Sequence, residues 1–483
     1  MHAAAYPRSA AGDCHDSGKK TRSSLFYNRL FETAHKNDFL HEATTLLNEY
    51  LDQLEVLDCD LPDDPQNLHA WMRQGAHLTT ESFAEYLNQR KKGAARNYFS
   101  NRAHAFHFLK SVAPTKLVDG AWLYGLLQHW QNPKFSGLVR TYVEELGAGI
   151  ADRNHVVIYK SLLARYGLDL ADDMDDGFYT QGVIQLALAN NAAAFLPEVI
   201  GFNLGYEQLP LHLLITAYEL NELNIDPYYF TLHTTIDNAD TGHACRAVHA
   251  VLDNLPQWGC ADEFWRRVQN GYKLSNAGMG TTQVMDSFDI DEEIIHIFRK
   301  KSIAGSGVHS DYCRLAGRTI NEWLACKEGI PEFLKTLQKT NWVVRGEPAA
   351  KSRFWNLLQG SRAEMSGVFS PYELQVIYDW IRGESSRDGQ PYTEADTENQ
   401  RLTQPSFRAA SRLEAVRSAS ILQTPLHTTG QQLLDSDLQM LIEQLLHLDS
   451  DGQQATLLKA MAPAYQWTPA GLYATKLFNA QIM

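Results

Sequence analysis

Cysteine is scarce in this chain of 483 residues, and the few cysteines are widely spaced. The six lie at positions 14, 59, 245, 260, 313 and 326, and no two form a Cys-x-x-Cys pair. This spacing argues against a disulfide framework, a zinc cluster and covalently attached haem. We therefore expect individual thiols in a reducing compartment.

The sequence also lacks long apolar runs and an excess of basic residues. No stretch of about 20 apolar residues occurs, and the first residues do not combine a basic start with an apolar core as a signal peptide does. Lys and Arg number 43 against 57 Asp and Glu, which gives a formal charge of −14. This charge argues against general affinity for phosphate backbones. We expect a cytoplasmic protein that binds neither nucleic acid nor membranes.

Strand-like alternation is rare, whereas helical periodicity runs through most of Ser82 to Leu337. A succession of helical segments with short breaks predicts an all-α bundle. Four segments are expected to be helices rich in aromatic residues: Tyr98–Leu109, Trp122–Trp130, Phe135–Leu146 and Val156–Tyr166.

The periodicity and composition also suggest how the chain is divided. We expect a disordered tail at 1–22, a helical bundle at 23–338 and a small helical module at 339–383. Residues 384–430 are rich in Ser, Gln and Thr and predict a linker or mobile loop. Apolar periodicity returns at 431–483, which predicts C-terminal helices docked on the bundle.

The segment His233 to His243, H-T-T-I-D-N-A-D-T-G-H, concentrates two histidines and two aspartates in about three turns of an expected helix. Asp237 lies about 40° and Asp240 about −20° from His233, so the three can share a face. His243 lies about −80° away and joins them only if the helix is distorted, which Gly242 permits. Carboxylate and imidazole together suit iron. The alternative is a solvated polar stripe.

A second candidate pair lies upstream in E-E-L-G-A-G-I-A-D-R-N-H. Glu145 and His155 are ten residues apart, which leaves their side chains about 80° apart on an ideal helix. They converge only if Gly147 and Gly149 bend the intervening turns.

A third carboxylate, Glu207, lies in the apolar segment F-N-L-G-Y-E-Q-L-P-L-H-L-L. A buried carboxylate is costly unless it is paired or bound to a metal. Glu198 and Glu219 lie in similar surroundings, and the sequence does not decide which of the three is a ligand.

In order, these residues resemble the ligand pattern of the haem-oxygenase-like diiron oxidases and oxygenases, also called iron-containing redox enzymes. The resemblance covers about Tyr98 to Leu337, and A-P-T-K-L-V-D-G-A-W-L at 113–123 is similar to the family's lead-in helix. The residues that carry it are Glu145, His155, Glu207, His233, Asp237 and His243.

The resemblance implies a haem-oxygenase-like helical bundle, here with a small helical C-terminal extension, that binds two ferrous ions, with Glu207 bridging them. It implies an oxidoreductase that uses O2 as co-substrate to oxidise a small organic compound. The reactions of such proteins are N-oxygenation, desaturation and oxidative carbon–carbon cleavage, often of amino-acid-derived or fatty-acid-like compounds in specialised metabolism. An external electron donor and a homodimer are compatible with it.

The chain departs from the family pattern in the third segment. That segment usually reads His, three residues, Asp, two residues, His, but Asp240 stands where the last His belongs. We favour Asp237 and His243 as ligands and keep Asp240 as a third candidate. Two alternatives stay open: a metal-free enzyme of the same fold that uses the carboxylates for acid–base chemistry, and a non-enzymatic helical scaffold.

Overall fold

A computed structural model describes residues 22–32, 40–169, 174–236, 242–359, 363–383 and 435–482. The expected tail at 1–22, except Arg22, and the expected linker at 384–430 lie outside the described residues. Almost all of the regular secondary structure in these residues is helical, which confirms the all-α prediction. Its strands are β1 (Arg314–Leu315) and β2 (Arg318–Thr319), an antiparallel pair in which Arg314 is opposite Thr319. No helix in these ranges is long and apolar enough to cross a membrane.

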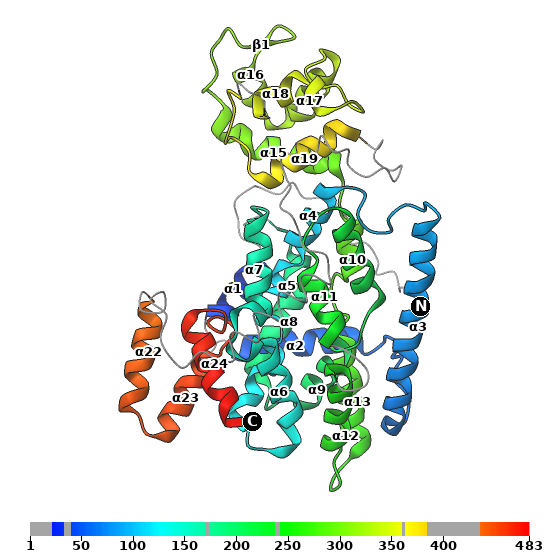
Figure 1. Ribbon diagram of the computed structural model, residues 1–483, viewed down its shortest axis with the longest axis vertical. Helices are drawn as coiled ribbons and strands as arrows, with labels where there is room; N and C mark the ends of the chain where they lie inside the picture. The colour runs from blue at the N-terminus through cyan, green and yellow to red at the C-terminus, as the bar shows by residue number, and fades with distance from the viewer. Residues whose placement is uncertain are drawn as a thin grey trace.

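The helices pack around two hydrophobic cores, and the first forms the lower body of the molecule (Figure 1). Its helices are α1 (Arg22–Glu32), α2 (Leu40–Leu54), α3 (Leu68–Lys91), η3 (Ala121–His129), α6 (Ser136–Glu145), α8 (Thr180–Asn191), α9 (Leu196–Tyr206), α12 (His243–Asn254), α13 (Ala261–Leu274), α22 (Ser436–His447), α23 (Ser450–Ala460) and α24 (Pro469–Ile482).

The second core continues upward into the lobe at the top of Figure 1. Its helices are α4 (Arg102–Ser111), α5 (Ala113–Lys116), α7 (His155–Arg165), α10 (Leu211–Glu222), α11 (Tyr228–Ile236), α14 (Thr281–Asp286), α15 (Ile290–Gly305), α16 (Ile320–Leu324), α17 (Ile330–Lys339), α18 (Arg353–Gln359) and α19 (Pro371–Arg382). Short 3-10 turns join the helices at Pro65–Asn67, Pro133–Phe135, Gly147–Gly149, Ala151–Arg153, Asp176–Tyr179, Lys327–Gly329 and Ala349–Lys351.

Three of the four expected aromatic helices form α4, α6 and α7, with ends shifted by a few residues. The fourth, expected at Trp122–Trp130, is the 3-10 helix η3 instead of an α-helix. The small module expected at 339–383 packs with α15 and α17 in the upper lobe, so the expected boundary at 338/339 falls inside one packed group. The C-terminal helices pack on the first core beside α6.

Helices α9 and α13 touch backbone to backbone, and two glycines make this contact sterically possible. A Cβ atom on Gly201 would lie 1.9 Å from the carbonyl oxygen of Val268, and one on Gly271 would lie 2.1 Å from that of Glu198. This contact fixes α9, the helix that immediately precedes Glu207.

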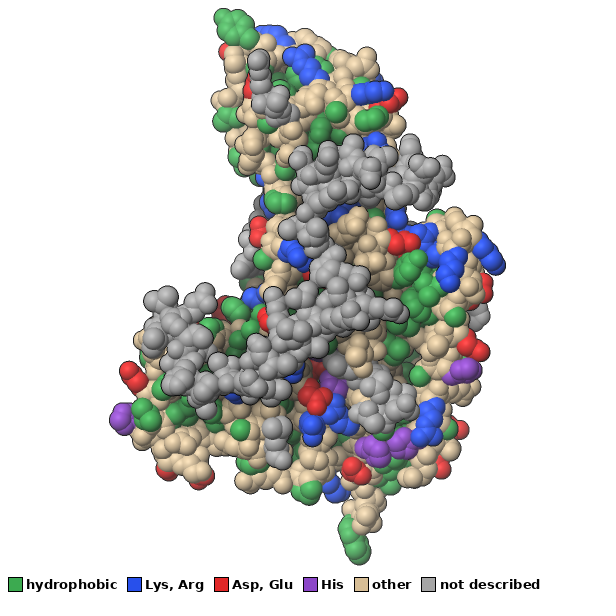
Figure 2. Space-filling model, viewed as in Figure 1, with side chains coloured by type: hydrophobic (Ala, Val, Ile, Leu, Met, Phe, Trp, Pro, Cys, Tyr) green, Lys and Arg blue, Asp and Glu red, His purple; other side chains and the backbone are tan. Residues whose placement is uncertain are grey.

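Acidic and basic side chains are interspersed on the face shown in Figure 2.

Candidate metal centre

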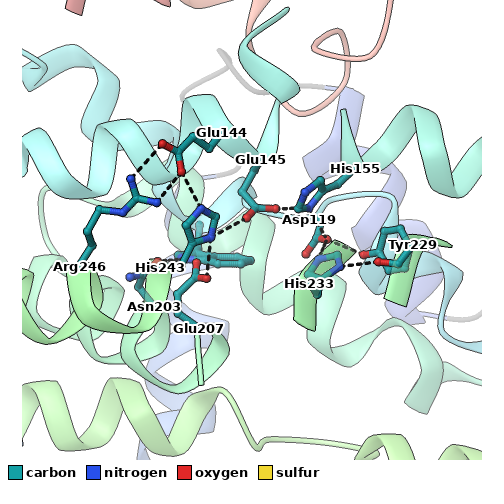
Figure 3. Close-up of polar contacts among 11 residues, drawn as sticks. Asp119, Glu144, Glu145, His155, Asn203, Glu207, Tyr229, His233, His243 and Arg246 are labelled. Carbon is teal, nitrogen blue, oxygen red and sulfur yellow. Dashed lines mark hydrogen bonds and ion pairs between the residues drawn. The ribbon is translucent and has the colours of Figure 1, made fainter. Parts of the chain in front are cut away.

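Six ionisable side chains meet in the interior of the described chain (Figure 3). They form two groups in which the candidate ligand atoms lie within 4.8 Å of one another. The first group is Asp119, Glu145, His155 and His233, and the second is Glu145, Glu207 and His243. All are buried except His233, whose side chain is 13% exposed. Only Glu145 belongs to both of these groups.

A sharp reversal of the chain brings Glu145 and His155 together. Glu145 is the last residue of α6 and His155 the first of α7. Between them Gly147 and Gly149 adopt φ values of +64° and +82°, the left-handed region that glycine tolerates best. A Cβ atom on Gly147 would lie 2.5 Å from backbone atoms of residues 153 and 154. The expected bend between the two ligands therefore requires glycine.

Hydrogen bonds of Asn154 stabilise this reversal at the start of α7. Its Oδ1 accepts a hydrogen bond from the backbone N–H of Val157 at 2.9 Å and so caps the helix. Its Nδ2 donates to Gln466 in the turn before α24. The hydroxyl of Tyr142 donates to the carbonyl of Met461 at 2.7 Å. The C-terminal segment thus supports both α6 and α7 directly behind the site.

In the first group, imidazole nitrogens face two carboxylates. Nδ1 of His155 contacts Glu145 and lies 3.6 Å from Oδ2 of Asp119. Nε2 of His233 lies 3.2 Å from the same Asp119 oxygen, while Nδ1 of His233 lies 2.8 Å from the carbonyl of Tyr229. Because a carbonyl only accepts, Nδ1 donates this hydrogen bond, and Nε2 is the nitrogen that faces Asp119. Asp119 also accepts a hydrogen bond from the Tyr229 hydroxyl.

The second group is built around His243, the first residue of α12. Its Nδ1 lies 3.0 Å from Oε2 of Glu207 and 3.2 Å from Oε1 of Glu145. Its Nε2 lies 3.0 Å from Oε2 of Glu144, which also pairs with Arg246. The other Glu207 oxygen, Oε1, is buried without a hydrogen-bond partner.

The charges of these groups stabilise one another. Burial alone would raise the pKa of Glu145, but His155 and His243 outweigh it and lower that pKa to about 2. Asp119 follows the same pattern, because its hydrogen bonds to His155 and His233 hold its pKa below the usual range despite burial. Burial alone would lower the pKa of His155, yet Glu145 and Asp119 raise it to about 10. Glu145 and Asp119 are therefore ionised at neutral pH, as metal ligands must be.

The structure brings Glu145, His155, Glu207, His233 and His243 into one site, as the ligand pattern requires. Asp237 and Asp240 lie outside the described residues. The expectation of a single helix from His233 to His243 is wrong, because α11 ends at Ile236 and α12 begins at His243 after an extended Gly242. His243 therefore reaches the site from the start of a separate helix.

The two rival glutamates have other partners. Glu198 accepts two hydrogen bonds from Arg267, at 2.7 and 2.6 Å. Glu219 accepts from the Tyr86 hydroxyl at 2.8 Å and from the backbone N–H groups of residues 97–99. Of the three candidates, Glu207 is the one beside Glu145 and His243, and the residue common to both groups is Glu145.

Sequence reasoning missed Asp119 and Glu144 as members of the site. Asp119 lies within the lead-in segment, before Gly120, and its signal was a single acidic residue followed by glycine in an apolar stretch. Gly120 has a φ of +76°, and a Cβ atom there would lie 3.0 Å from Cβ of Glu145. A glycine at this position therefore allows α6 to approach Asp119. Glu144 gave no separate signal in the sequence, because the adjacent Glu145 was already assigned as the ligand of that segment.

The donor set fits iron. Carboxylate oxygens and imidazole nitrogens are ligands that non-haem iron takes in proteins. The buried, unpartnered Oε1 of Glu207 would otherwise carry a desolvation penalty of about 1–3 kcal/mol. The hydrogen bond from His233 to the Tyr229 carbonyl is the orienting contact that metal-bound histidines make.

Comparison with known proteins agrees with this geometry. Residues 106–275 match the model of a family described as iron-containing redox enzymes, and all six residues of the two groups lie within the match. No curated protein and no solved structure matches the chain. Both groups of ligands therefore lie in a segment, residues 106–275, that is similar to the iron-containing redox enzymes.

Proposed function

We propose that this protein is a non-haem diiron oxidoreductase that uses O2 to oxidise a small organic substrate. The observation that carries the proposal is the position of Glu145. Its Oε2 faces His155 of the first group and its Oε1 lies 3.2 Å from His243 of the second. A carboxylate that offers one oxygen to each of two ligand groups is arranged to bridge two metal ions.

The remaining ligands divide between the two positions. Asp119, His155 and His233 would hold one iron together with Glu145, and Glu207 and His243 would hold the other. Bound ferrous iron supplies the electrons and the open coordination positions that O2 reduction needs. The protein holds the ligands on four helices and two connecting turns, and their burial keeps bulk water from the reacting atoms.

The substrate class follows from the family resemblance. We propose N-oxygenation, desaturation or oxidative carbon–carbon cleavage of an amino-acid-derived or fatty-acid-like compound.

Anaerobic loading with ferrous iron, followed by metal quantification and measurement of O2 uptake, tests the proposal. We expect about two irons per chain and O2 consumption that depends on them. Glu145→Ala should lose both irons and Glu207→Ala one, because Glu145 contacts both groups and Glu207 one. The matched control is Glu332→Ala, which removes an exposed glutamate that pairs with Lys339 on α17. Helix α17 lies in the upper lobe (Figure 1).

The outcomes separate the alternatives. Full iron retention in Glu145→Ala would refute the bridging role. A parent protein that binds no iron would instead favour the metal-free enzyme, in which the contact between Glu145 and His155 serves acid–base chemistry.

A further inference from the structure

The imidazole of His243 lies between two consecutive glutamates at the end of α6. Neighbouring residues on a helix point about 100° apart, so Glu144 and Glu145 leave α6 in different directions. The Glu145 side chain is 4% exposed and faces Nδ1 of His243 from the interior. The Glu144 side chain is 37% exposed and faces Nε2 from the solvent side, at 3.0 Å. Figure 3 shows the ring between them.

This arrangement would give the two nitrogens of His243 different roles when a metal is bound. A neutral imidazole carries one N–H, and an ionised carboxylate can only accept a hydrogen bond. A metal held by Glu145 and Glu207 would take Nδ1, the nitrogen on their side, in place of its proton. Glu144 would then accept the remaining N–H from Nε2 and hold the ring in that orientation.

Glu144 is itself held in place. Arg246, three residues after His243 on α12, donates from Nη1 to Oε1 of Glu144 at 3.0 Å and from Nη2 to Oε2. This two-point contact fixes the plane of the carboxylate, because the guanidinium fork is rigid. The contact that Glu144 makes with Arg140, at 3.1 Å, lies on the exposed side of α6.

We propose that Glu144 is a positioning residue for the second group alone, an inference that rests on the proposed diiron function. It orients His243 and sets which nitrogen is free to bind metal. The contacts described for Glu144 involve His243, Arg246 and Arg140, and the ligands unique to the first group are not among them. Loss of Glu144 should therefore weaken one metal position and spare the other.

Anaerobic titration with Co2+, followed by its visible absorption, tests this role in the full-length protein. We expect two equivalents in the parent protein. Glu144→Ala should keep one tight equivalent and bind the second about 10–100-fold more weakly, the usual cost of losing such an outer contact. Glu144→Gln retains an acceptor oxygen at the same place and should recover most of that affinity. Glu332→Ala, the remote glutamate control, should behave as the parent does.

The absorption bands separate positioning from a general structural role. If Glu144 positions His243, only the bands of the weakened equivalent change in Glu144→Ala. Two equivalents with parental affinity, or an equal weakening of both, would overturn the proposal. If Glu144→Ala does not fold, a Glu144→Gln protein that binds less tightly than the parent at both positions equally would also overturn it. A parent protein that binds no Co2+ would reject the metal centre itself, and the role of Glu144 with it.

Discussion

Replacing Gly147 with alanine should damage the metal centre from outside the set of ligands. Gly147 has a φ of +64°, and its missing Cβ would lie 2.5 Å from backbone atoms of residues 153 and 154. Those atoms belong to the turn that returns the chain from Glu145 to His155. An alanine there must push the two sides of the reversal apart, and this separates the two ligands.

The expected loss of stability is the sum of two free-energy costs. An alanine in the left-handed region costs about 1–2 kcal/mol, and overpacking against fixed backbone costs about 1–3 kcal/mol more. We therefore expect Gly147→Ala to lower the free energy of unfolding by about 2–5 kcal/mol. Gly93→Ala is the matched control, because Gly93 has a φ of +89° and nothing lies within 4 Å of its absent Cβ. Gly93→Ala should therefore cost only the free energy of placing an alanine in the left-handed region, about 1–2 kcal/mol.

Urea unfolding followed by circular dichroism measures the stability of both variants, and iron quantification on the folded fraction measures the site. Gly147→Ala should be the less stable variant by about 1–3 kcal/mol and should retain less iron per folded chain. Gly93→Ala should load iron as the parent does. Equal stability and equal iron content in the two variants would refute the argument that the close approach at Gly147 holds Glu145 and His155 together.

Three further predictions concern other contacts of the site and the upper lobe. Asp119→Ala removes the acceptor for His233 and Tyr229 and should reduce bound iron from about two to about one per chain; two retained irons would exclude Asp119 as a ligand. Asn154→Ala should lower the free energy of urea unfolding by about 2–4 kcal/mol, because it removes a helix cap and a buried hydrogen bond to Gln466. Asn132→Ala, which removes an exposed cap, should cost less than about 1 kcal/mol, and equal losses would contradict this account. Burial raises the pKa of Asp379 to about 6, so its ionisation destabilises the folded state as pH rises from about 4 to about 6. Asp379→Asn should therefore gain stability relative to the parent over that interval, by up to about 3 kcal/mol, and a difference in unfolding free energy that does not change with pH would refute the assignment.

The local sequence was sufficient for features that depend on neighbouring residues. Helical periodicity and the scarcity of alternating segments predicted the all-α fold, because both reflect which face of a helix is buried. The glycines between Glu145 and His155 predicted the bend, since only a chain able to enter the left-handed region can reverse so tightly. The apolar surroundings of Glu207 predicted that its carboxylate would need a partner.

The sequence did not show which partner each buried carboxylate would take. Glu198, Glu207 and Glu219 carry the same local signal, but Glu198 meets Arg267 from α13 and Glu219 meets Tyr86 from α3. Those contacts join residues 69 and 133 positions apart along the chain. Helical periodicity indicates which side chains are buried, but it does not indicate which residues of other helices contact them.

The tertiary structure also determined which residues meet in the candidate metal centre. Angular spacing along one helix placed His243 away from His233, but Gly242 is extended and a second helix, which begins at His243, presents this residue from another direction. Asp119 enters the site because Gly120 lets α6 approach it closely. The sequence by itself determined the helices, the bend and the need to pair buried carboxylates, whereas the tertiary structure decided which of them meet, because a metal site is defined by distances between segments that no local pattern encodes.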